Sequence, residues 1–299
     1  MLTISPVSED FVAEITGLDL SNGLKPEEFK QLSNALDRYA VLVLPDQPLN
    51  EEQQLSFASN FGPLETSVGA SIYNASSPRR LQKPQLSDIS NLNEQGRVLD
   101  QNDMRRLINL SNQLWHTDSS FKRIPASVSI LSAQEVPAVG GATEFADMRA
   151  AWDALTNERK RELEPLIATH DYFHSRMLTG FKVDSVPEDW RQRQPPVKQV
   201  LIRTHPATGR KSLYLASHIS HIGQMNKQDS LQLLDELMQF ATRPEFTYRH
   251  RWRTNDVVIW DNRCTMHRGR PFNESDRRAM RRATVQDSAP TVAAEPALA

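Results

Sequence analysis

The chain has a single cysteine, Cys264, among its 299 residues. One cysteine excludes a disulfide within the chain and is typical of a reducing compartment, so we expect a cytoplasmic protein. No apolar run approaches the roughly 20 residues that a membrane-spanning helix needs, and the first residues lack the basic and apolar regions of a signal peptide. A formal net charge of -2 argues against a nucleic-acid partner.

Hydrophobic spacing predicts many strands with helices inserted between them. Helices are predicted over 26–38, 51–61, 146–163 and 230–241, and strands over 41–44, 127–131, 200–204, 212–215, 246–252, 256–260 and 283–286. This mixture predicts a mainly β fold with inserted helices, a double-stranded β-helix (jelly roll) whose interior can enclose a ligand. No linker divides the chain, so we expect one domain over residues 1–287 and a disordered, Ala- and Pro-rich tail over 288–299.

The segment Trp115-His116-Thr117-Asp118 and the distant His267 together suggest a metal site. If His116 and Asp118 lie on a strand, both side chains project from one face and can bind a single ion. Two histidines and one carboxylate leave three positions of an octahedral ion open, as in non-haem Fe(II) oxygenases. A zinc hydrolase uses the same residue types with a metal-activated water. Cys264 is expected to be a small buried residue and not a ligand.

Two arginines follow at strand spacing, in the run from Arg277 to Thr284. On a strand Arg278 and Arg282 point the same way, about 13 Å apart, so both can face one cavity. A guanidinium group matches a carboxylate bidentately, so one arginine would bind a dicarboxylate cosubstrate and the other an anionic substrate. The competing interpretations are a solvated basic edge strand and a cluster of phosphate contacts for nucleic acid.

The chain resembles the Fe(II)/2-oxoglutarate-dependent dioxygenases of the taurine dioxygenase and 2,4-dichlorophenoxyacetate dioxygenase family, with the greater likeness to the phenoxyacetate branch. The resemblance runs from Ile4 to Asp287. Its most specific blocks are Asn60 to Glu65, Asn112 to Phe121, Gly140 to Arg149 and Tyr248 to Thr284. It implies the jelly-roll fold, a homo-oligomer, Fe(II), 2-oxoglutarate and dioxygen as cosubstrates, and stimulation by ascorbate.

The resemblance assigns the metal and cosubstrate residues position by position. His116, Asp118 and His267 match the family's iron ligands. Arg278 matches the arginine that binds the distal carboxylate of 2-oxoglutarate, assisted by the hydroxyl of Thr143. The aromatic residue beside that cosubstrate corresponds to Trp260, for which plain core packing is the alternative.

The resemblance also assigns three substrate residues. Arg282 matches the arginine that binds the acidic group of the substrate. Asn112 matches an asparagine near the substrate, with structural capping as its alternative. His218 matches a segment lining the substrate pocket, with a structural histidine as its alternative. Four further histidines are left out of the site: His250 is expected in the core with a hydrogen-bond partner, and His170, His174 and His205 have no constellation around them.

The implied reaction couples decarboxylation of 2-oxoglutarate to hydroxylation of a small organic acid anion. An aryloxyacetate such as 2,4-dichlorophenoxyacetate would be hydroxylated beside its ether oxygen, and the resulting hemiacetal would collapse to a phenol and glyoxylate. The polar stretch over 66–106 is expected to be a mobile lid. Its Arg79, Arg80 and Lys83 match neither branch, so taurine and other alkyl sulfonates, aryloxypropionates and natural aromatic or aliphatic acids remain open as substrates.

Overall fold

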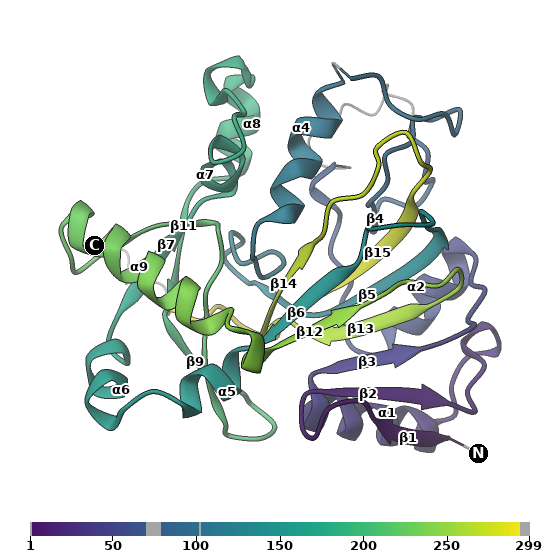
Figure 1. The fold of residues 1–299 in the computed structure, drawn as a ribbon, viewed down its shortest axis with the longest axis horizontal. Coiled ribbons are helices and arrows are strands. Elements are labelled where there is room, and N and C mark those ends of the chain that lie inside the picture. Colours follow the sequence, from purple (N-terminus) through teal and green to yellow (C-terminus); the bar gives the residue numbers. More distant parts are fainter. Residues whose placement is uncertain (1, 70–78, 102, 294–299) are drawn as a thin grey trace, which may run out of the picture.

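The computed structural model describes residues 2–69, 79–101 and 103–293. Two facing sheets form its centre (Figure 1). The large sheet contains, in spatial order, β1 (Thr3–Pro6), β2 (Val12–Thr16), β3 (Val41–Leu44), β13 (Val257–Asp261), β5 (Ala126–Glu135), β15 (Ala279–Gln286) and β4 (Leu86–Asp88). The small sheet contains β12 (Thr247–His250), β6 (Thr143–Asp147) and β14 (Thr265–Gly269). This arrangement is the predicted jelly roll with inserted helices.

Aromatic and aliphatic side chains fill the space between the two sheets. The rings of Phe145 on β6 and Trp260 on β13 meet edge to face, with centroids 5.5 Å apart. Met280 on β15 and Leu131 on β5 belong to the same buried cluster. Strand side chains alternate between the two faces of a sheet, so Arg278 and Arg282, two residues before and after Met280, lie on this inner side.

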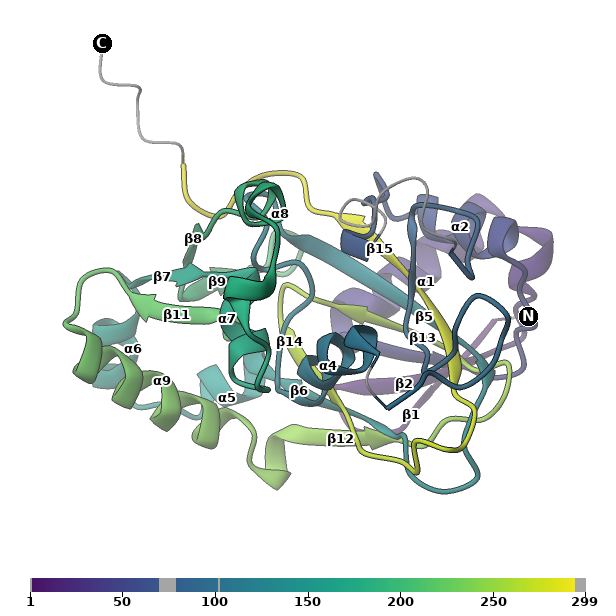
Figure 2. The ribbon, with the colours of Figure 1, turned by 90° about the horizontal axis from the view of Figure 1, so that it is seen from above.

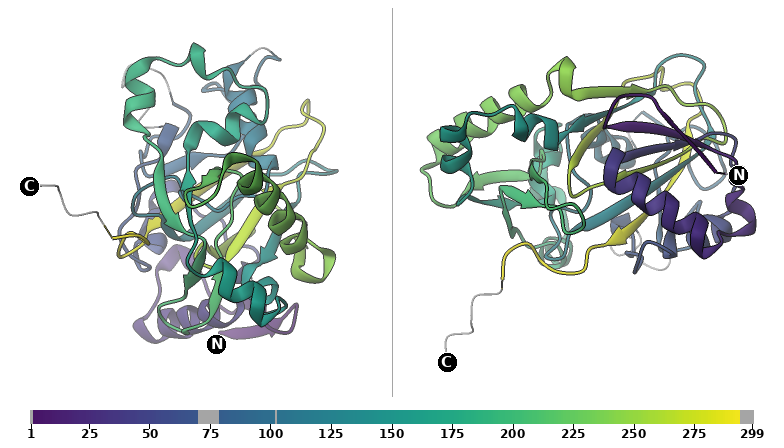
Figure 3. Two further views of the ribbon diagram at one scale, coloured as in Figure 1. Left: turned by 90° about the vertical axis from the view of Figure 1, so that its left-hand side faces the viewer. Right: turned by 90° about the horizontal axis from the view of Figure 1, so that it is seen from below.

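Two helices cover the outer face of the large sheet: α1 (Pro26–Tyr39) and α2 (Glu51–Ser59). Proline at the first position and a capping box through Glu28 start α1. Leu32 and Leu36, one turn apart, are buried against the sheet, and the helix ends at Ala40 in a left-handed conformation. Figure 3 shows α1 lying across this face, with α9 (Lys227–Ala241) at the far end of the molecule.

A second lobe follows the small sheet. It contains a sheet of β7 (Ile167–His170), β8 (Val197–Val200) and β11 (Ile219–Ile222), and the predicted hairpin of β9 (Ile202–Thr204) and β10 (Lys211–Leu213). Its helices are α5 (Met148–Asp153), α6 (Asn157–Leu163), α7 (Tyr172–Met177), α8 (Glu188–Arg193) and α9. The helix α4 (Met104–Leu110) packs against α7 (Figure 2). Short 3-10 helices lie at Leu20–Asn22, Ser111–Gln113, Val183–Ser185 and Pro244–Phe246.

The single helix predicted over 146–163 is wrong. The segment begins inside β6, and two helices, α5 and α6, follow it. Asp147 caps α5, with its carboxylate accepting from the backbone N–H groups of Arg149 and Ala150. Thr156 caps α6 in the same way. Both caps start new helices inside a stretch whose apolar spacing fits one continuous helix.

Within the described residues, no helix is long and apolar enough to cross a membrane. The segment predicted to be a lid, residues 66–106, includes β4 and the start of α4; positions 70–78 and 102 lie outside the described residues. In the segment predicted to be a tail, the Thr291 hydroxyl contacts the side chain of Gln199 and accepts a hydrogen bond from the backbone N–H of Val200, 3.2 Å away.

A glycine turn brings the loop before β15 close to the start of β6. Gly140 has φ +83° and pairs with Phe272, and a Cβ placed there would lie 2.6 Å from the carbonyl oxygen of Pro271. We therefore expect Gly140→Ala to lower the free energy of unfolding by about 2–5 kcal/mol, through left-handed strain and overpacking. Denaturant unfolding measures this difference.

Gly209 supplies the matched control, because it has φ +69° and no atom within 4 Å of an added Cβ. Gly209→Ala is expected to cost about 1 kcal/mol, from strain alone. Equal losses in the two variants would contradict the close approach at Gly140.

Candidate metal centre and adjoining cavities

Three side chains from distant segments come together at one end of the space between the sheets. His116 and His267 form an antiparallel bridge, with backbone N···O distances of 3.0 and 2.8 Å. His116 Nε2 lies 3.9 Å from Asp118 Oδ1, and His267 Nε2 lies 3.8 Å from Asp118 Oδ2. All three residues are buried, and one donor atom from each lies within 4.8 Å of the others. The sequence therefore identified a real cluster of potential ligands.

The segment from His116 to Asp118 is not the strand that we expected. His116 makes a single bridge, and the chain then enters a turn at Asp118, with Ser119 at φ +51°. The hydroxyl of Thr117 donates to the carbonyl oxygens of Leu215 and Thr265. These contacts hold the turn and direct His116 and Asp118 to the same point without a regular strand.

A network around Asp118 fixes its carboxylate. Ser129 Oγ donates to Asp118 Oδ2 at 2.7 Å, and Asn262 Nδ2 donates to Ser129 Oγ at 2.9 Å. Asn262 Oδ1 accepts from the backbone N–H of Asp118 and from Trp260 Nε1. Neither Ser129 nor Asn262 was predicted from the sequence. The available signal was the position of Asn262, two residues after Trp260 in the Trp-Asp-Asn run.

The charge states of the three side chains suit a divalent cation. Burial lowers the pKa of His116, and burial and neighbouring His116 hold the pKa of His267 well below its usual value, so both imidazoles are neutral at pH 7. His116 Nδ1 lies 2.7 Å from the carbonyl oxygen of Leu114, which directs Nε2 toward Asp118. Burial acts to raise the pKa of Asp118, but the charge of Arg282 and the hydrogen bond from Ser129 favour the ionised form, so the pKa of this carboxylate lies below its usual value. Two neutral imidazoles and one carboxylate fit Fe(II).

A small cavity of about 110 Å³ lies beside this cluster and is lined by Thr143, Trp260, His267, Arg278 and Arg282. Trp260 is fully buried and its ring centroid lies 4.6 Å from that of His267. Thr143 Oγ1 accepts a hydrogen bond from Trp252 Nε1 at 2.9 Å. The three residues predicted for the cosubstrate, Thr143, Trp260 and Arg278, thus surround one cavity.

Arg278 lies in this cavity, and it has no counterion among the described residues. Only 9% of the residue is exposed, its side chain donates to the carbonyl oxygen of Ile89 at 3.2 Å, and no carboxylate of the described residues lies within 4.0 Å of it. Burial lowers its pKa to about 10, so it remains charged at neutral pH. A buried, unpaired guanidinium group is costly unless an anion joins it.

The solvated-edge interpretation of this arginine run is wrong. The strand β15 lies between β5 and β4 inside the large sheet. Arg278 and Arg282 face the cavities, as their spacing predicted. Arg281 points to the other side of β15, where its guanidinium group contacts the carbonyl oxygen of Leu49. Arg277 pairs with Glu135.

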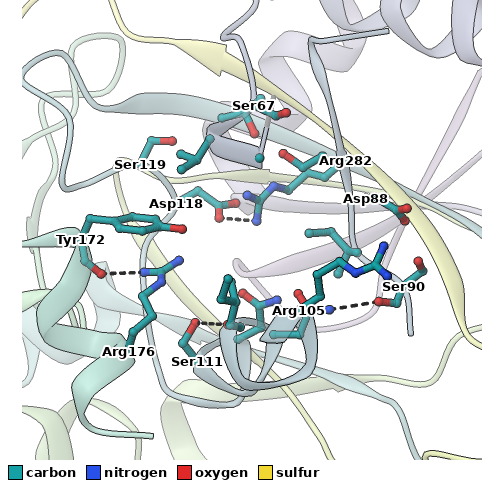
Figure 4. Close-up of a pocket in the computed structure, with 18 of the residues that line it drawn as sticks. Ser67, Asp88, Ser90, Arg105, Ser111, Asp118, Ser119, Tyr172, Arg176 and Arg282 are labelled. Atoms are coloured by element: carbon teal, nitrogen blue, oxygen red, sulfur yellow. Dashed lines mark hydrogen bonds and ion pairs between the residues drawn. The ribbon is translucent and has the colours of Figure 1, made fainter. Parts of the chain in front are cut away.

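A larger cavity of about 530 Å³ adjoins the first (Figure 4). His116, Asn112 and Arg282 line both cavities, and Asp118 and His218 line the larger one. The guanidinium group of Arg282 is paired with Asp118. All the residues predicted for metal, cosubstrate and substrate are therefore gathered around two connected cavities.

One wall of the larger cavity is aromatic. It comprises Phe121, Tyr172, Phe173, Phe181 and Trp190, which belong to one packed cluster. His218 lies against this wall: its ring centroid is 4.9 Å from that of Phe121 and 6.0 Å from that of His116. Burial and the nearby Arg176 hold the pKa of His218 well below its usual value. Neither this aromatic wall nor Arg176 was predicted from the sequence.

The prediction that no constellation surrounds His205 is wrong, because this histidine lies in a second cluster with two carboxylates. His205 Nε2 lies 2.8 Å from Asp261 Oδ2 and 3.8 Å from Asp37 Oδ1. Arg263 donates to both carboxylate oxygens of Asp261. Arg263 thus neutralises Asp261, and Asp37, His205 and Asp261 line neither of the two cavities described above. For His250, another histidine left out of the site, the predicted hydrogen-bond partner is confirmed: its Nε2 lies 3.1 Å from Asp256 Oδ2. Cys264 is buried and outside both clusters.

Comparison with known proteins gives the chain a family. Residues 3–284 match the model of the family described as "Taurine catabolism dioxygenase TauD, TfdA family". The chain is 45% identical to the alpha-ketoglutarate-dependent 2,4-dichlorophenoxyacetate dioxygenase of Cupriavidus pinatubonensis, over 95% of this chain and 98% of that protein. It is 36% identical to an (S)-phenoxypropionate/alpha-ketoglutarate-dioxygenase of Sphingobium herbicidovorans, over 93% and 92%.

A solved structure agrees with these relatives. The crystal structure of AAD-2 in complex with Mn(II) and N-oxalylglycine superposes with a TM-score of 0.89 at 44% identity, and the match covers 98% of this chain and 100% of that one. The metal cluster therefore serves an oxygenase and not a zinc hydrolase. The chain belongs to the taurine catabolism dioxygenase TauD, TfdA family and is a non-haem iron dioxygenase that depends on 2-oxoglutarate.

Proposed function

We propose that this enzyme hydroxylates an aryloxyalkanoate at the carbon that bears both the carboxylate and the ether oxygen. The observation that carries the proposal is the larger cavity, in which an aromatic wall, the buried Arg176 and the half-buried Arg282 lie beside the cluster of His116, Asp118 and His267. An aryl ring matches the wall, and a carboxylate matches the guanidinium groups. The names of the two relatives above, a 2,4-dichlorophenoxyacetate and a phenoxypropionate dioxygenase, support the same substrate class.

In this proposal the chain's own residues bind and orient three components. His116, Asp118 and His267 would hold Fe(II), and the bound ion would supply, with 2-oxoglutarate, the dioxygen chemistry needed to oxidise an unreactive C–H bond. Arg278 binds the distal carboxylate of 2-oxoglutarate, and the hydroxyl of Thr143 and the ring of Trp260 lie beside it. The ring of Trp260, 4.6 Å from that of His267 between centroids, packs against this ligand and supports its orientation.

Arg282, Asn112 and His218 complete the substrate site. Arg282 holds the acid group next to Asp118, so the carbon that bears the carboxylate lies toward the metal cluster. His218, neutral and against Phe121, contributes to the surface that contacts the ring. For an aryloxyacetate the overall reaction consumes dioxygen and 2-oxoglutarate and yields succinate, carbon dioxide, a phenol and glyoxylate.

Succinate release tests this substrate class. The purified enzyme, with Fe(II), 2-oxoglutarate and ascorbate, is given 2,4-dichlorophenoxyacetate, aryloxypropionates or taurine. We expect an aryloxy acid to stimulate succinate formation, with an equal amount of phenol. Stimulation by taurine alone would transfer the substrate to the alkyl sulfonates, and slow succinate release that none of the acids stimulates would contradict the aryloxyalkanoate proposal while leaving the enzyme class intact.

Three further features remain proposals. We propose that residues 1–287 act as one domain whose segment 66–106 is a lid, since Ser67, Arg80 and Leu81 line the larger cavity. Protection of this segment from proteolysis by substrate and cosubstrate would test the lid. We also propose a cytoplasmic homo-oligomer, which light scattering and cell fractionation would test.

A further inference from the structure

We propose that Arg176 is a second anion-binding residue of the substrate cavity, and that the acid group of the substrate lies between Arg176 and Arg282. The inference rests on the proposed function for the identity of the acid. It makes the preference of the cavity for anions depend on a residue of α7, far in the sequence from the arginine run that contains Arg278 and Arg282.

Arg176 is a buried cation without a carboxylate partner in the described part of the chain. Only 8% of the residue is exposed. Nη1 donates to the carbonyl oxygen of Tyr172 and to the hydroxyl of Ser175, both at 2.9 Å. Nε is buried with no hydrogen-bond partner. The guanidinium carbon lies 3.6 Å from the ring centroid of Tyr172, so the aromatic ring fixes the plane of the group.

Two other cations around the same cavity already have carboxylate partners. Arg105 pairs with Asp103, and Lys122 pairs with Glu65. Arg176 has two donor nitrogens, Nε and Nη2, that no described residue occupies. A buried guanidinium group with free donors loses its hydration energy and gains too few hydrogen bonds from the protein to compensate. An anionic ligand would supply the missing hydrogen-bond acceptors.

The neighbouring positive charge indicates where that anion would lie. Arg176 and Arg282 line the same cavity, and burial, with a smaller contribution from the charge of Arg282, lowers the pKa of Arg176. Asp118 is the carboxylate that Arg282 contacts, and it is also the expected ligand of the metal. Figure 4 shows the guanidinium group of Arg176 beneath the ring of Tyr172 and turned toward the Asp118–Arg282 pair. One carboxylate between the two arginines would relieve their repulsion and satisfy the free donors of Arg176.

Binding to an inactive complex tests the proposal without turnover. The enzyme is loaded with Mn(II) and N-oxalylglycine, and calorimetry compares two pairs of probes: phenoxyacetate with 2-phenoxyethanol, and hexanoate with hexanol. In Arg176→Gln we expect acid affinity to fall about 10- to 100-fold, as for loss of a charge-assisted hydrogen bond. Alcohol affinity should change less than about threefold. Arg176→Lys, which keeps the charge but not the planar fork, should lie between.

Lys122→Gln is the matched control, because Lys122 lines the same cavity but already pairs with the carboxylate of Glu65. It should bind the acids like the unaltered enzyme. Unchanged N-oxalylglycine affinity in Arg176→Gln confirms that the variant is folded. An equal loss of acid and alcohol affinity in that variant would reduce Arg176 to a packing role and overturn the proposal, as would full retention of acid binding.

The two probe pairs separate this inference from the proposed function. If the unaltered enzyme binds hexanoate but not phenoxyacetate, the aryloxyalkanoate proposal fails, and loss of hexanoate binding in Arg176→Gln still supports the anion site. Binding of neither acid to the unaltered enzyme would overturn both.

Discussion

Asp118→Ala is expected to abolish Fe(II)-dependent succinate formation. The carboxylate is the single anionic donor of the buried cluster with His116 and His267, so its loss removes a ligand and most of the attraction for a divalent cation. It also leaves Arg282 without its counterion. We expect activity to fall more than about a hundredfold, beyond the 10- to 100-fold loss typical of removing a group that only supports a ligand. Succinate assays measure the loss of activity, and calorimetric titration with the metal ion measures the loss of metal affinity.

Asp37→Ala provides the control from the second His/carboxylate cluster. Asp37 lies 3.8 Å from His205, which is hydrogen-bonded to Asp261, so the cluster has the residue types of a metal site. Arg263 already neutralises Asp261 there. Metal affinity should therefore be unchanged in Asp37→Ala. Retained activity in Asp118→Ala, with lost metal binding in Asp37→Ala, would move the metal centre to His205.

Ser129→Ala should give a smaller loss than Asp118→Ala. Ser129 donates a 2.7 Å hydrogen bond to Asp118 Oδ2, and it is itself held by Asn262. Removing a group that orients a ligand typically costs about 10- to 100-fold in metal affinity or activity. Metal titration of this variant gives the measurement. A loss as large as that of Asp118→Ala would show that the carboxylate has no binding position of its own without Ser129.

Local features of the fold were predictable from hydrophobic spacing and turn residues. The helix starting at Pro26, the strand at Val41–Leu44 and the hairpin around Gly209 all lie where the sequence places them. The order of strands was not predictable, because β3 pairs with β13 more than 200 residues later. The break between α5 and α6 was not predicted because the apolar spacing is compatible with one continuous helix. The N-cap at Thr156, which starts α6, does not interrupt that spacing.

The site was predictable where residue type and spacing carry the chemistry, and not where only tertiary contacts do. The His-x-Asp pair and the arginine spacing led to His116, Asp118 and Arg278. Arg176 escaped because a single arginine in a short helix has no pattern around it. Its importance appears only from the folded structure, in which Arg176 lies against the ring of Tyr172 and has no carboxylate partner among the described residues.

Arg278→Ala is expected to weaken 2-oxoglutarate much more than the organic acid. The guanidinium group is buried in the small cavity beside Thr143 and Trp260. Among the described residues, its side chain has a carbonyl oxygen as partner but no carboxylate. The distal carboxylate of 2-oxoglutarate would supply the missing partner by forming a bidentate pair with the guanidinium group. Loss of the pair should raise the KM for 2-oxoglutarate about 10- to 100-fold. Steady-state kinetics at varied 2-oxoglutarate, and calorimetry with N-oxalylglycine, give the measurement.

Two neighbours on β15 make this prediction specific. Arg281 is also buried, but it faces away from the cavities and contacts the carbonyl oxygen of Leu49, so Arg281→Ala should lower stability without changing 2-oxoglutarate affinity. Arg282→Ala should chiefly weaken the organic acid, because Arg282 lines the larger cavity beside Asp118. Equal effects of Arg278→Ala and Arg282→Ala on both ligands would refute the assignment of one arginine to each. In that case the alternation of side chains along β15 would distinguish only the residues that face the cavities from those that face away. It would not assign the two arginines to different ligands.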